Sequence, residues 1–363
     1  MGDRSVLTEM PRLTVASVVP GGGLAEDELA CWSALQQANE SLASPFFSPA
    51  FTSIVAAARN DVSVALLNEG EQLRGFFPFQ RGRLGVGRPV GSILSDYQGA
   101  IVADDARWDA KALIRACGLN TWEFEHVVAS QRPLSSFRHG THESLRIDVS
   151  NSFDRYLSEL RLHHGDSFRH LQRMMRKFER EHGELRFVPH SDDPEILATL
   201  LAWKSAQYKR TGAADILQRE WVCEVLGRVH RCQSTDFAGV LSTIGTATRP
   251  VAIHLGLRSP SVLHSWFAAY DPAFAKYSPG LIVLLKIAEG AQESRIRTID
   301  LGYGDYGFKR LLTTHTVALM QGSVETPSLA ATATRARRAL RSVIRSTGVA
   351  PSARRLARRM GSR

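Results

Sequence analysis

Three apolar stretches that follow one another, FAGVLSTI (residues 237–244), VAIHLGL (251–257) and VLHSWFAAY (262–270), decide the fold of the second half of this sequence. Apolar residues alternate along them and turn-forming residues separate them, which predicts three successive antiparallel strands. An apolar helix, LIVLLKIAEGA, then begins after residues 278–280, and a strand (RTIDL, 297–301), a glycine-rich loop (GYGDYG, 302–307) and a strand near 316–320 complete the unit. The predicted order is therefore β-β-β-α-β-loop-β.

The first half of the sequence shows a similar order of elements. We expect a helix at 49–60, a strand pair beginning at 62 and 73, a short strand at 100–102, a helix at 108–117 and a strand at 121–128. An amphipathic helix at 153–182 and helices near 194–210 and 218–231 link the halves. The repeated order suggests two copies of one fold, although the letters show no long repeat.

Length and composition indicate a globular protein of two domains, each with its own core. The chain has 363 residues, of which 44% are hydrophobic and 22% charged, and this argues against both a disordered and an integral membrane protein. No apolar run of signal-peptide or membrane-spanning length is visible, so we expect a cytoplasmic location. The four cysteines follow no metal-ligand spacing, and we expect reduced core residues and no metal.

The positive charge belongs to the end of the sequence. Residues 328–363 contain ten Arg and no acidic residue, and subtracting them from the net charge of +9 leaves −1 for the remainder. An apolar stripe within this tail predicts a basic amphipathic helix that docks on an anionic membrane surface or on nucleic acid, with a disordered solubilising tail as the alternative. Basic residues also surround the apolar stripe of the 153–182 helix, where a solvated face and a wall for an anionic acceptor are the two interpretations.

The predicted strands offer candidates for catalysis. His254 lies between small residues on one face of its strand, where an imidazole with room beside it is suited to general-base catalysis; a core histidine is the alternative. On the next strand His264, Trp266 and Tyr270 share one parity, so they either line the same groove or are half-buried sheet residues.

The segments around the apolar helix and the glycine-rich loop suggest ligand contacts. Tyr277 to Gly280 places a serine cap, a proline and a glycine at a helix N-terminus, an arrangement that suits a pyrophosphate but is also an ordinary helix start. The loop matches G-x-G-x-x-G, but only eight residues separate Gly307 from Thr316, too few for a dinucleotide-binding crossover. We expect its side chains to project toward a substrate.

Taken together, AIHLGL, HSWFAAYDPAFAKYSPGLIVLLKIAEGA and IDLGYGDYGFKR resemble the C-terminal GNAT-like domain of the CelD-like family, which is linked to cellulose and polysaccharide biosynthesis. The FemAB aminoacyl transferases are more distant relatives. Earlier stretches, among them GSILSDYQGAIV, SFRHLQRMMRKFEREHG and LLAWKSAQYKRTG, resemble that family in the same order, so the likeness covers roughly residues 45–322.

The resemblance implies an α/β (α+β) fold of two tandem GNAT-like domains, each a mixed, mostly antiparallel sheet flanked by helices. We predict an N-terminal domain at 1–150, a helical segment at 151–233, a catalytic domain at 234–326 and a basic tail at 327–363. It also implies an acyltransferase that moves an acetyl or other acyl group from acyl-CoA to an amine or hydroxyl acceptor, which includes a saccharide. The open alternatives are a FemAB-like transferase that uses aminoacyl-tRNA, the one nucleic acid expected, and a non-catalytic component of a polysaccharide-export complex.

The resemblance also assigns roles to the candidate residues. The proposed base is His254 or Asp271, and a tyrosine after the strand IDL protonates the leaving thiolate. The predicted catalytic residues are His254, Asp271, Tyr303 and Tyr306; those contacting acyl-CoA are Tyr277, Ser278, Gly280 and Leu281; those contacting the acceptor are His264, Trp266, Tyr270, Asp305 and Lys309. A polysaccharide-modifying enzyme of this kind would dock at the inner membrane through its tail.

Overall fold

The computed structural model describes residues 12–304 and 307–326. The predictions for Asp305, Tyr306 and the basic tail therefore lie outside the described residues.

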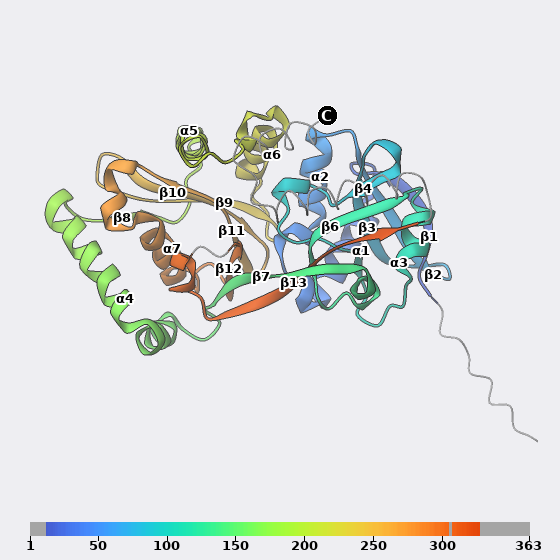
Figure 1. The fold of residues 1–363 in the computed structure, drawn as a ribbon, viewed down its shortest axis with the longest axis horizontal. Helices are drawn as coiled ribbons and strands as arrows, with labels where there is room; N and C mark the ends of the chain where they lie inside the picture. Colours follow the sequence, from blue (N-terminus) through green and yellow to red (C-terminus); the bar gives the residue numbers. More distant parts are fainter. Residues whose placement is uncertain (1–11, 305–306, 327–363) are drawn as a thin grey trace, which may run out of the picture.

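The first half of the structure is a β-α-α-β-β unit followed by two short strands, a helix and two longer strands (Figure 1). Its elements are β1 (Thr14–Pro20), α1 (Glu26–Ala38), α2 (Pro49–Ala58), β2 (Val62–Glu69), β3 (Gln72–Arg81), β4 (Val86–Arg88), β5 (Ile101–Val102), α3 (Ala110–Ala116), β6 (Thr121–Val128) and β7 (Arg138–Asp148). The predicted strand pair, short strand, helix and strand are all present, whereas the sequence did not indicate β1, α1 and β7.

The second half begins with the long helix α4, which has a kink at His164, and then repeats the order of the first. Its elements are α4 (Phe153–His182), β8 (Arg186–Val188), α5 (Pro194–Thr211), α6 (Glu220–Arg231), β9 (Ala238–Gly245), β10 (Pro250–Arg258), β11 (Val262–Tyr270), α7 (Pro279–Glu289), β12 (Thr298–Tyr303), α8 (Gly307–Arg310) and β13 (His315–Glu325). The predicted order β-β-β-α-β-loop-β is confirmed, with a short helix at the end of the loop.

The strands of the described residues form one 13-stranded sheet in the order β1-β2-β3-β4-β6-β13-β7-β12-β11-β10-β9-β8, with β5 added beside β3. Every named strand pair is antiparallel except β4 with β6 and β11 with β12. The predicted mixed, mostly antiparallel sheet flanked by helices is thus confirmed.

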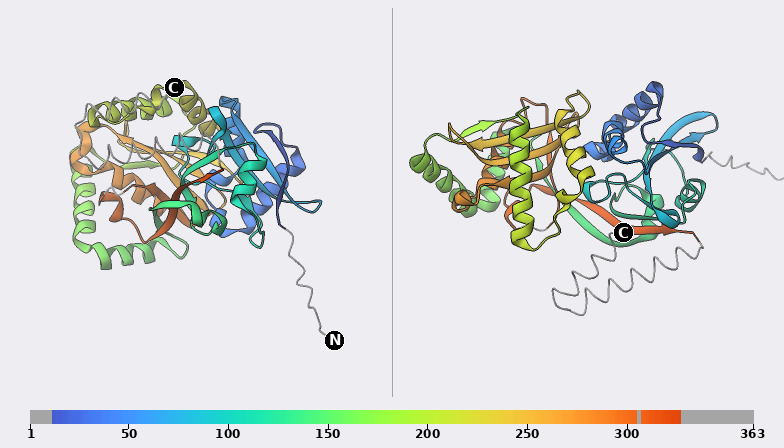
Figure 2. Two further views of the ribbon diagram at one scale, coloured as in Figure 1. Left: turned by 45° about the vertical axis from the view of Figure 1, so that its right-hand side comes forward. Right: turned by 90° about the horizontal axis from the view of Figure 1, so that it is seen from above.

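The last strand of each half pairs with a strand of the other half. The sequence β1-α1-α2-β2-β3-β4/β5-α3-β6-β7 corresponds to β8-α5-α6-β9-β10-β11-α7-β12-β13. However, β7 pairs with β12 of the second half, and β13 pairs with β6 of the first. The two long strands also pair with each other, so they join the halves at the middle of the molecule (Figures 1 and 2). The boundaries proposed at residues 150, 233 and 326 remain predictions.

The two halves share a hydrophobic core on one face of the sheet. This core joins Trp32 of α1 and Val55 of α2 to Leu200 of α5, Val225 of α6 and Leu255 of β10. On the other face, α4 and α7 cover a second core and α3 covers a third. Each half thus has a core of its own, as expected, but helices from both halves also pack over one face and form a shared core that the sequence did not indicate.

Candidate active site

The pairing of β11 with β12 ends abruptly in the middle of both strands. The two parallel strands are in register only from Val262 opposite Thr298 to His264 opposite Asp300. Beyond that point β11 continues to Tyr270 along β10, while β12 continues to Tyr303 beside β7. We call the opening between their separated ends the strand gap.

A β-bulge marks the start of the strand gap. Leu255 lies opposite Phe267 and Gly256 opposite Ser265, so Trp266 is the extra residue of β11. The bulge ends the simple alternation assumed from the sequence. Trp266 packs on the core shared by both halves and donates to Leu94 O at 2.8 Å, whereas Tyr270 packs on the opposite face. These two predicted groove residues therefore do not line one surface.

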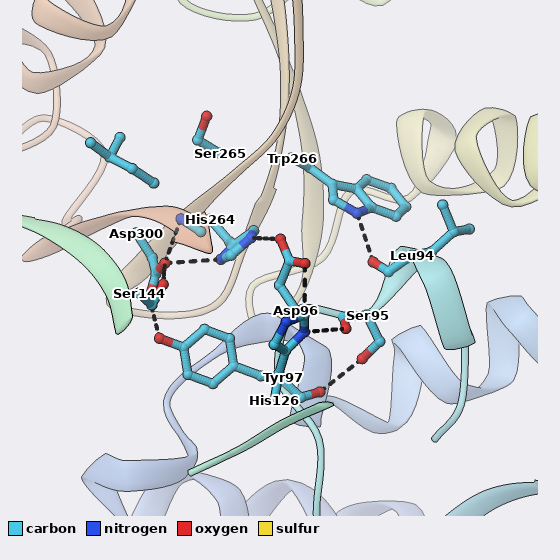
Figure 3. A network of polar contacts seen from close by, with 12 residues as sticks. Leu94, Ser95, Asp96, Tyr97, His126, Ser144, His264, Ser265, Trp266 and Asp300 are labelled. Atoms are coloured by element: carbon cyan, nitrogen blue, oxygen red, sulfur yellow. Dashed lines mark hydrogen bonds and ion pairs between the residues drawn. The ribbon is translucent and has the colours of Figure 1, made fainter. Parts of the chain in front are cut away.

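His264 lies between two carboxylates at the closed end of the strand gap (Figure 3). Its Nε2 is 2.9 Å from Asp96 Oδ2, and its Nδ1 is 3.4 Å from Asp300 Oδ1. The imidazole and the Asp300 carboxylate are buried, whereas 30% of the Asp96 side chain is exposed. Asp96 is thus the member of this triad that a substrate can reach.

Asp300 has partners on every side. Its Oδ1 accepts from Ser144 Oγ at 2.6 Å and from Gly302 N at 2.9 Å, and its Oδ2 accepts from Tyr97 Oη at 2.6 Å and Arg146 Nε at 2.8 Å. Gly302 has a φ of +73°, and a Cβ at this position would lie 3.0 Å from Asp96 Oδ2. A glycine therefore allows β12 to pass closely over the carboxylates.

The charges of this network support one another. The carboxylates of Asp300 and Asp96 raise the pKa of His264 to about 9 against the effect of its burial, so the ring is an imidazolium at neutral pH. His264 and Arg146 in turn hold the pKa of Asp300 well below its usual range, although burial alone would raise it. The result is a fixed ion cluster that holds Asp96 in place.

Two lysine ammonium groups lie at the two edges of the strand gap. Lys204 of α5 donates to Ala268 O of β11 at 3.1 Å, and Lys309 of α8 donates to Leu301 O of β12 at 2.6 Å. Burial, followed by repulsion from Lys309, lowers the pKa of Lys204 to about 8. Burial likewise lowers the pKa of Lys309, and Asp96 and Asp300 oppose that shift. The strand gap is therefore a cationic environment.

The edge of β11 also offers backbone donors. Asp271 N donates to Val251 O across the β10 pair at 3.0 Å, and backbone groups of an antiparallel strand alternate in direction. The N–H groups of Tyr270 and Ala268 therefore point away from β10, toward the strand gap. The pairing of β11 with β12 ends at His264, so in the described part of the chain no strand pairs with β11 beside these two N–H groups.

His254 lies beneath this surface. It is completely buried on β10, its Nε2 is 2.9 Å from Ser265 Oγ, and its Nδ1 has no hydrogen-bond partner in the described part of the chain. Burial, together with the positive charges of His264 and Lys309, lowers the pKa of His254 to about 3. A neutral, inaccessible ring of this kind is poorly suited to take a proton from a substrate.

Asp271 lies at the opposite end of β11 from His264. Its Oδ1 accepts from Ala273 N at 2.9 Å, and its Oδ2 is 3.6 Å from Arg249 NH1. The carboxylate thus caps the turn that leads toward α7 and is not part of the Asp96 network.

The predicted acyl-CoA contacts surround the start of α7. Ser278 occupies the cap position with a φ of +57°, but its side chain makes no capping bond. Gly280 is open, since a Cβ there would meet only Tyr270 Cδ1 at 4.0 Å. Tyr277 is buried, with its hydroxyl bonded to Glu181 and His182 of α4, and Leu281 packs on the core. Gly280 is therefore the member of this set that leaves space for a ligand.

Tyr303 ends β12 on the side of the strand exchange. Its ring is 47% exposed and packs against His142 and His126, with ring centroids 4.4 and 5.3 Å away. His126 Nδ1 lies 4.0 Å from Asp96 Oδ1, so the ring of His126 connects Tyr303 to the Asp96 network. Of the predicted residues, the structure brings His264, Tyr303 and Lys309 together.

Asp96, Tyr97 and Ser95 reach the site from the first half. They belong to a loop between β4 and β5, which pair with opposite ends of β3 and together correspond to β11. Gln98 of this loop closes the counterpart of the strand gap, because it bridges to Val127 and its Oε1 accepts from Glu125 N and His126 N. The first half thus has no open gap and supplies side chains to the second.

No cluster of three or more His, Cys, Asp or Glu with a geometry for a metal ion occurs in residues 12–304 and 307–326. Among the helices in the same ranges, none is both long enough and apolar enough to cross a bilayer.

Residues 166–310 match the family model of the acetyltransferase (GNAT) domain. This range contains β8 to β12 with α5, α6 and α7, and hence both strands of the gap. This part of the chain is therefore similar to a GNAT acetyltransferase domain, and the first half adds Asp96 to it. Comparison with curated proteins gave no significant match.

Comparison with solved structures gave several matches, of which the Bacteroides protein below supports a similar fold. A conserved protein of unknown function from Bacteroides thetaiotaomicron VPI-5482 has a TM-score of 0.51 and 11% identity, covering 81% of this chain and 97% of its own. FemX has a TM-score of 0.48 and 11% identity (72% and 86% covered). A tandem GNAT protein from the clavulanic acid biosynthesis pathway has a TM-score of 0.44 and 12% identity (87% and 100% covered). The likeness to the Bacteroides protein extends over both halves of the chain.

Proposed function

We propose that this protein transfers an acetyl or other acyl group from acyl-CoA to an amine or hydroxyl acceptor at the strand gap. The observation that carries the proposal is the gap itself, within the matched GNAT domain: two strands separate at His264 and Asp300, with free backbone donors on one edge, two ammonium groups and one accessible carboxylate. Acyl transfer needs these groups, because negative charge develops on the carbonyl oxygen while the acceptor loses a proton.

The thioester of the donor lies in the strand gap in this proposal. The N–H group of Ala268 donates to the carbonyl oxygen, and the ammonium groups of Lys204 and Lys309 stabilise the tetrahedral oxyanion. Gly280 at the open start of α7 leaves the pyrophosphate close to backbone N–H groups. All these groups are already in place before reaction, which is what electrostatic stabilisation of a transition state requires.

Asp96 takes the acceptor proton in this scheme. Its carboxylate is accessible and fixed by His264, whereas His254 is buried and neutral and Asp271 caps a turn. The acceptor nitrogen or oxygen attacks the thioester carbon, its proton passes to Asp96, and the C–S bond then breaks to release the thiolate of coenzyme A. The exposed Tyr303, which packs on His126 beside Asp96, is our candidate for protonating that thiolate.

The resemblance of the sequence to the CelD-like family extends the proposal to a saccharide acceptor in polysaccharide or cell-envelope biosynthesis. An exposed tyrosine beside two histidines and a carboxylate suits a sugar, which combines an apolar ring face with hydroxyl groups. As part of this proposal, the protein lies in the cytoplasm and residues 327–363 dock it on the inner membrane.

Titration of the protein with acetyl-CoA tests the proposal. We expect saturable binding, at least about 10-fold weaker in Gly280→Asp, because the added carboxylate repels the pyrophosphate while favouring the helix N-terminus. Gly22→Asp, at an exposed turn after β1 where an added Cβ would meet nothing within 4 Å, is the matched control and leaves the affinity unchanged. Salt-sensitive tRNA binding without acetyl-CoA binding would instead support the aminoacyl-tRNA alternative, and binding of neither would support a non-catalytic component.

The pH dependence of transfer tests the role of Lys204. Its pKa of about 8 means that the ammonium form is present below this pH and is lost above it. We therefore expect kcat/KM to fall as the pH rises past about 8, and Lys204→Arg to move this fall upward by at least about one unit. If kcat/KM of the arginine variant, measured with the same acceptor, falls at the same pH as in the wild type, then another group causes this fall.

A further inference from the structure

The first half contains a large open cavity that the proposed reaction does not use. It has a volume of about 780 Å³ and lies between the end of α1, the loop after β5 and the start of the 3₁₀ helix Arg132–Phe137. Small-molecule sites commonly have volumes of roughly 300–1,000 Å³. The cavity is thus large enough for a ligand the size of a nucleotide or a disaccharide.

Its position corresponds to the outer end of the strand gap in the second half. β5 corresponds to the end of β11, α3 to α7, and the segment after β6 to the loop after β12. The first half therefore retains an opening where the second half has its proposed donor site.

The inner part of this opening is closed to an acyl chain. The side chain of Gln131 accepts from Ala100 N at 3.0 Å and donates to Ala100 O at 2.8 Å, so its amide takes the place of a neighbouring strand. Gly99, with a φ of +143°, permits this contact, because a Cβ there would lie 2.5 Å from the Gln131 amide. A ligand is thus confined to the cavity and cannot enter between the strands.

Three arginines surround the cavity. Arg12, Arg107 and Arg132 are exposed at its border, and no carboxylate forms an ion pair with any of them in the part of the chain that the structure describes. The nearby carboxylates have other partners: Asp104 accepts from Asn39 Nδ2 at 3.2 Å, and Asp109 accepts from Ala112 N at 2.7 Å. The cavity therefore offers guanidinium groups for an anion.

The other residues that line the cavity suit a ligand whose non-phosphate part is rich in hydroxyl groups. Trp108 is half-buried in the wall, and Asn39, Asp104 and Asp109 provide planar amide and carboxylate groups. Arginine binds phosphate through paired N–H groups, and an indole face packs on a sugar ring or a base. We infer that this cavity binds a phosphorylated sugar or nucleotide at a site separate from the acyl-transfer site.

Calorimetric titration of the full chain with ADP, glucose 1-phosphate, inorganic pyrophosphate and glucose tests this site. We expect the phosphorylated compounds to bind with Kd below about 1 mM and glucose not to bind. If ADP binds more tightly than pyrophosphate, the part of the ligand beyond the phosphate is a nucleoside. If glucose 1-phosphate binds more tightly than pyrophosphate, that part is a sugar. Absence of binding by every phosphorylated compound overturns the inference.

Arginine variants locate the binding. Arg107→Ala with Arg132→Ala weakens binding by at least about 10-fold, whereas Arg115→Ala, an exposed arginine of α3 outside the cavity lining, leaves it unchanged. Acetyl-CoA binding is retained in the double variant, which distinguishes this site from the strand gap. ADP binding that survives in the double variant but is lost in Gly280→Asp would place the phosphate at α7 and refute the inference.

Discussion

Replacing Asp96 with Asn lowers kcat by about 10²- to 10⁴-fold, the contribution that a positioned general base commonly makes. The amide keeps the shape of the side chain and its contact with His264, but it cannot take a proton from the acceptor. Single-turnover measurements with saturating donor and acceptor separate this step from binding. Because the change is made at a partly exposed side chain, we expect the affinity for acetyl-CoA to stay within about two-fold of the wild type.

Asp192→Asn is the matched control for this variant. Asp192 is 89% exposed and pairs with His190, so the same chemical change there leaves kcat unaltered. A wild-type kcat in Asp96→Asn, with chemistry shown to be rate-limiting, would refute the role of Asp96 as base and direct attention to Tyr303 or to the two lysines.

Replacing Asp300 with Asn lowers the free energy of unfolding by about 3–5 kcal/mol, because it removes the anion of a buried cluster and leaves the charges of His264 and Arg146 uncompensated. Urea denaturation followed by circular dichroism measures the change. Ser144→Ala removes one hydrogen bond of the same carboxylate and lowers the free energy by about 1–3 kcal/mol, which keeps the test available if the Asn variant does not fold.

The pH dependence of stability provides an independent check on Asp300. Its pKa is lowered in the folded state, so the stabilisation is complete above the unfolded value of about 4 and is lost as the pH falls below it. We expect the free energy of unfolding to decrease less at acid pH in Asp300→Asn than in the wild type. An Asn variant within about 0.5 kcal/mol of the wild type, with an unchanged acid limb, would show that the cluster does not stabilise the fold.

The sequence predicted the order of elements because this order depends on local patterns. Alternation in 251–257 and 262–270, the apolar helix after Pro279 and the turns between them are each readable within about ten residues. The amphipathic helix at 153–182 was predicted with its structural bounds for the same reason, and its apolar stripe at Phe168, Leu171 and Phe178 is buried as expected.

Other features had weak or no local signals. The one-residue bulge at Trp266 leaves no mark on an alternating pattern, so the parity argument placed Trp266 and Tyr270 on one face. His254 looked accessible because its neighbours are small, but Ser265 and the strands on both sides cover it. Lys204 lay in a stretch that read as an ordinary helix, although a lysine on the face that packs against the sheet was an available clue.

The sequence by itself indicated a similar order of strands and helices in the two halves, and it placed His264, Tyr303 and Lys309 around a strand–loop segment of the second half. Only the tertiary structure decided what acts together there. The exchange of β7 and β13 brings Ser144 and Arg146 against β12, and a loop of the first half brings Asp96 to His264 across 168 positions of sequence. Pairing between strands so far apart depends on the global packing of the two halves, a non-local property that hydrophobic periodicity does not encode.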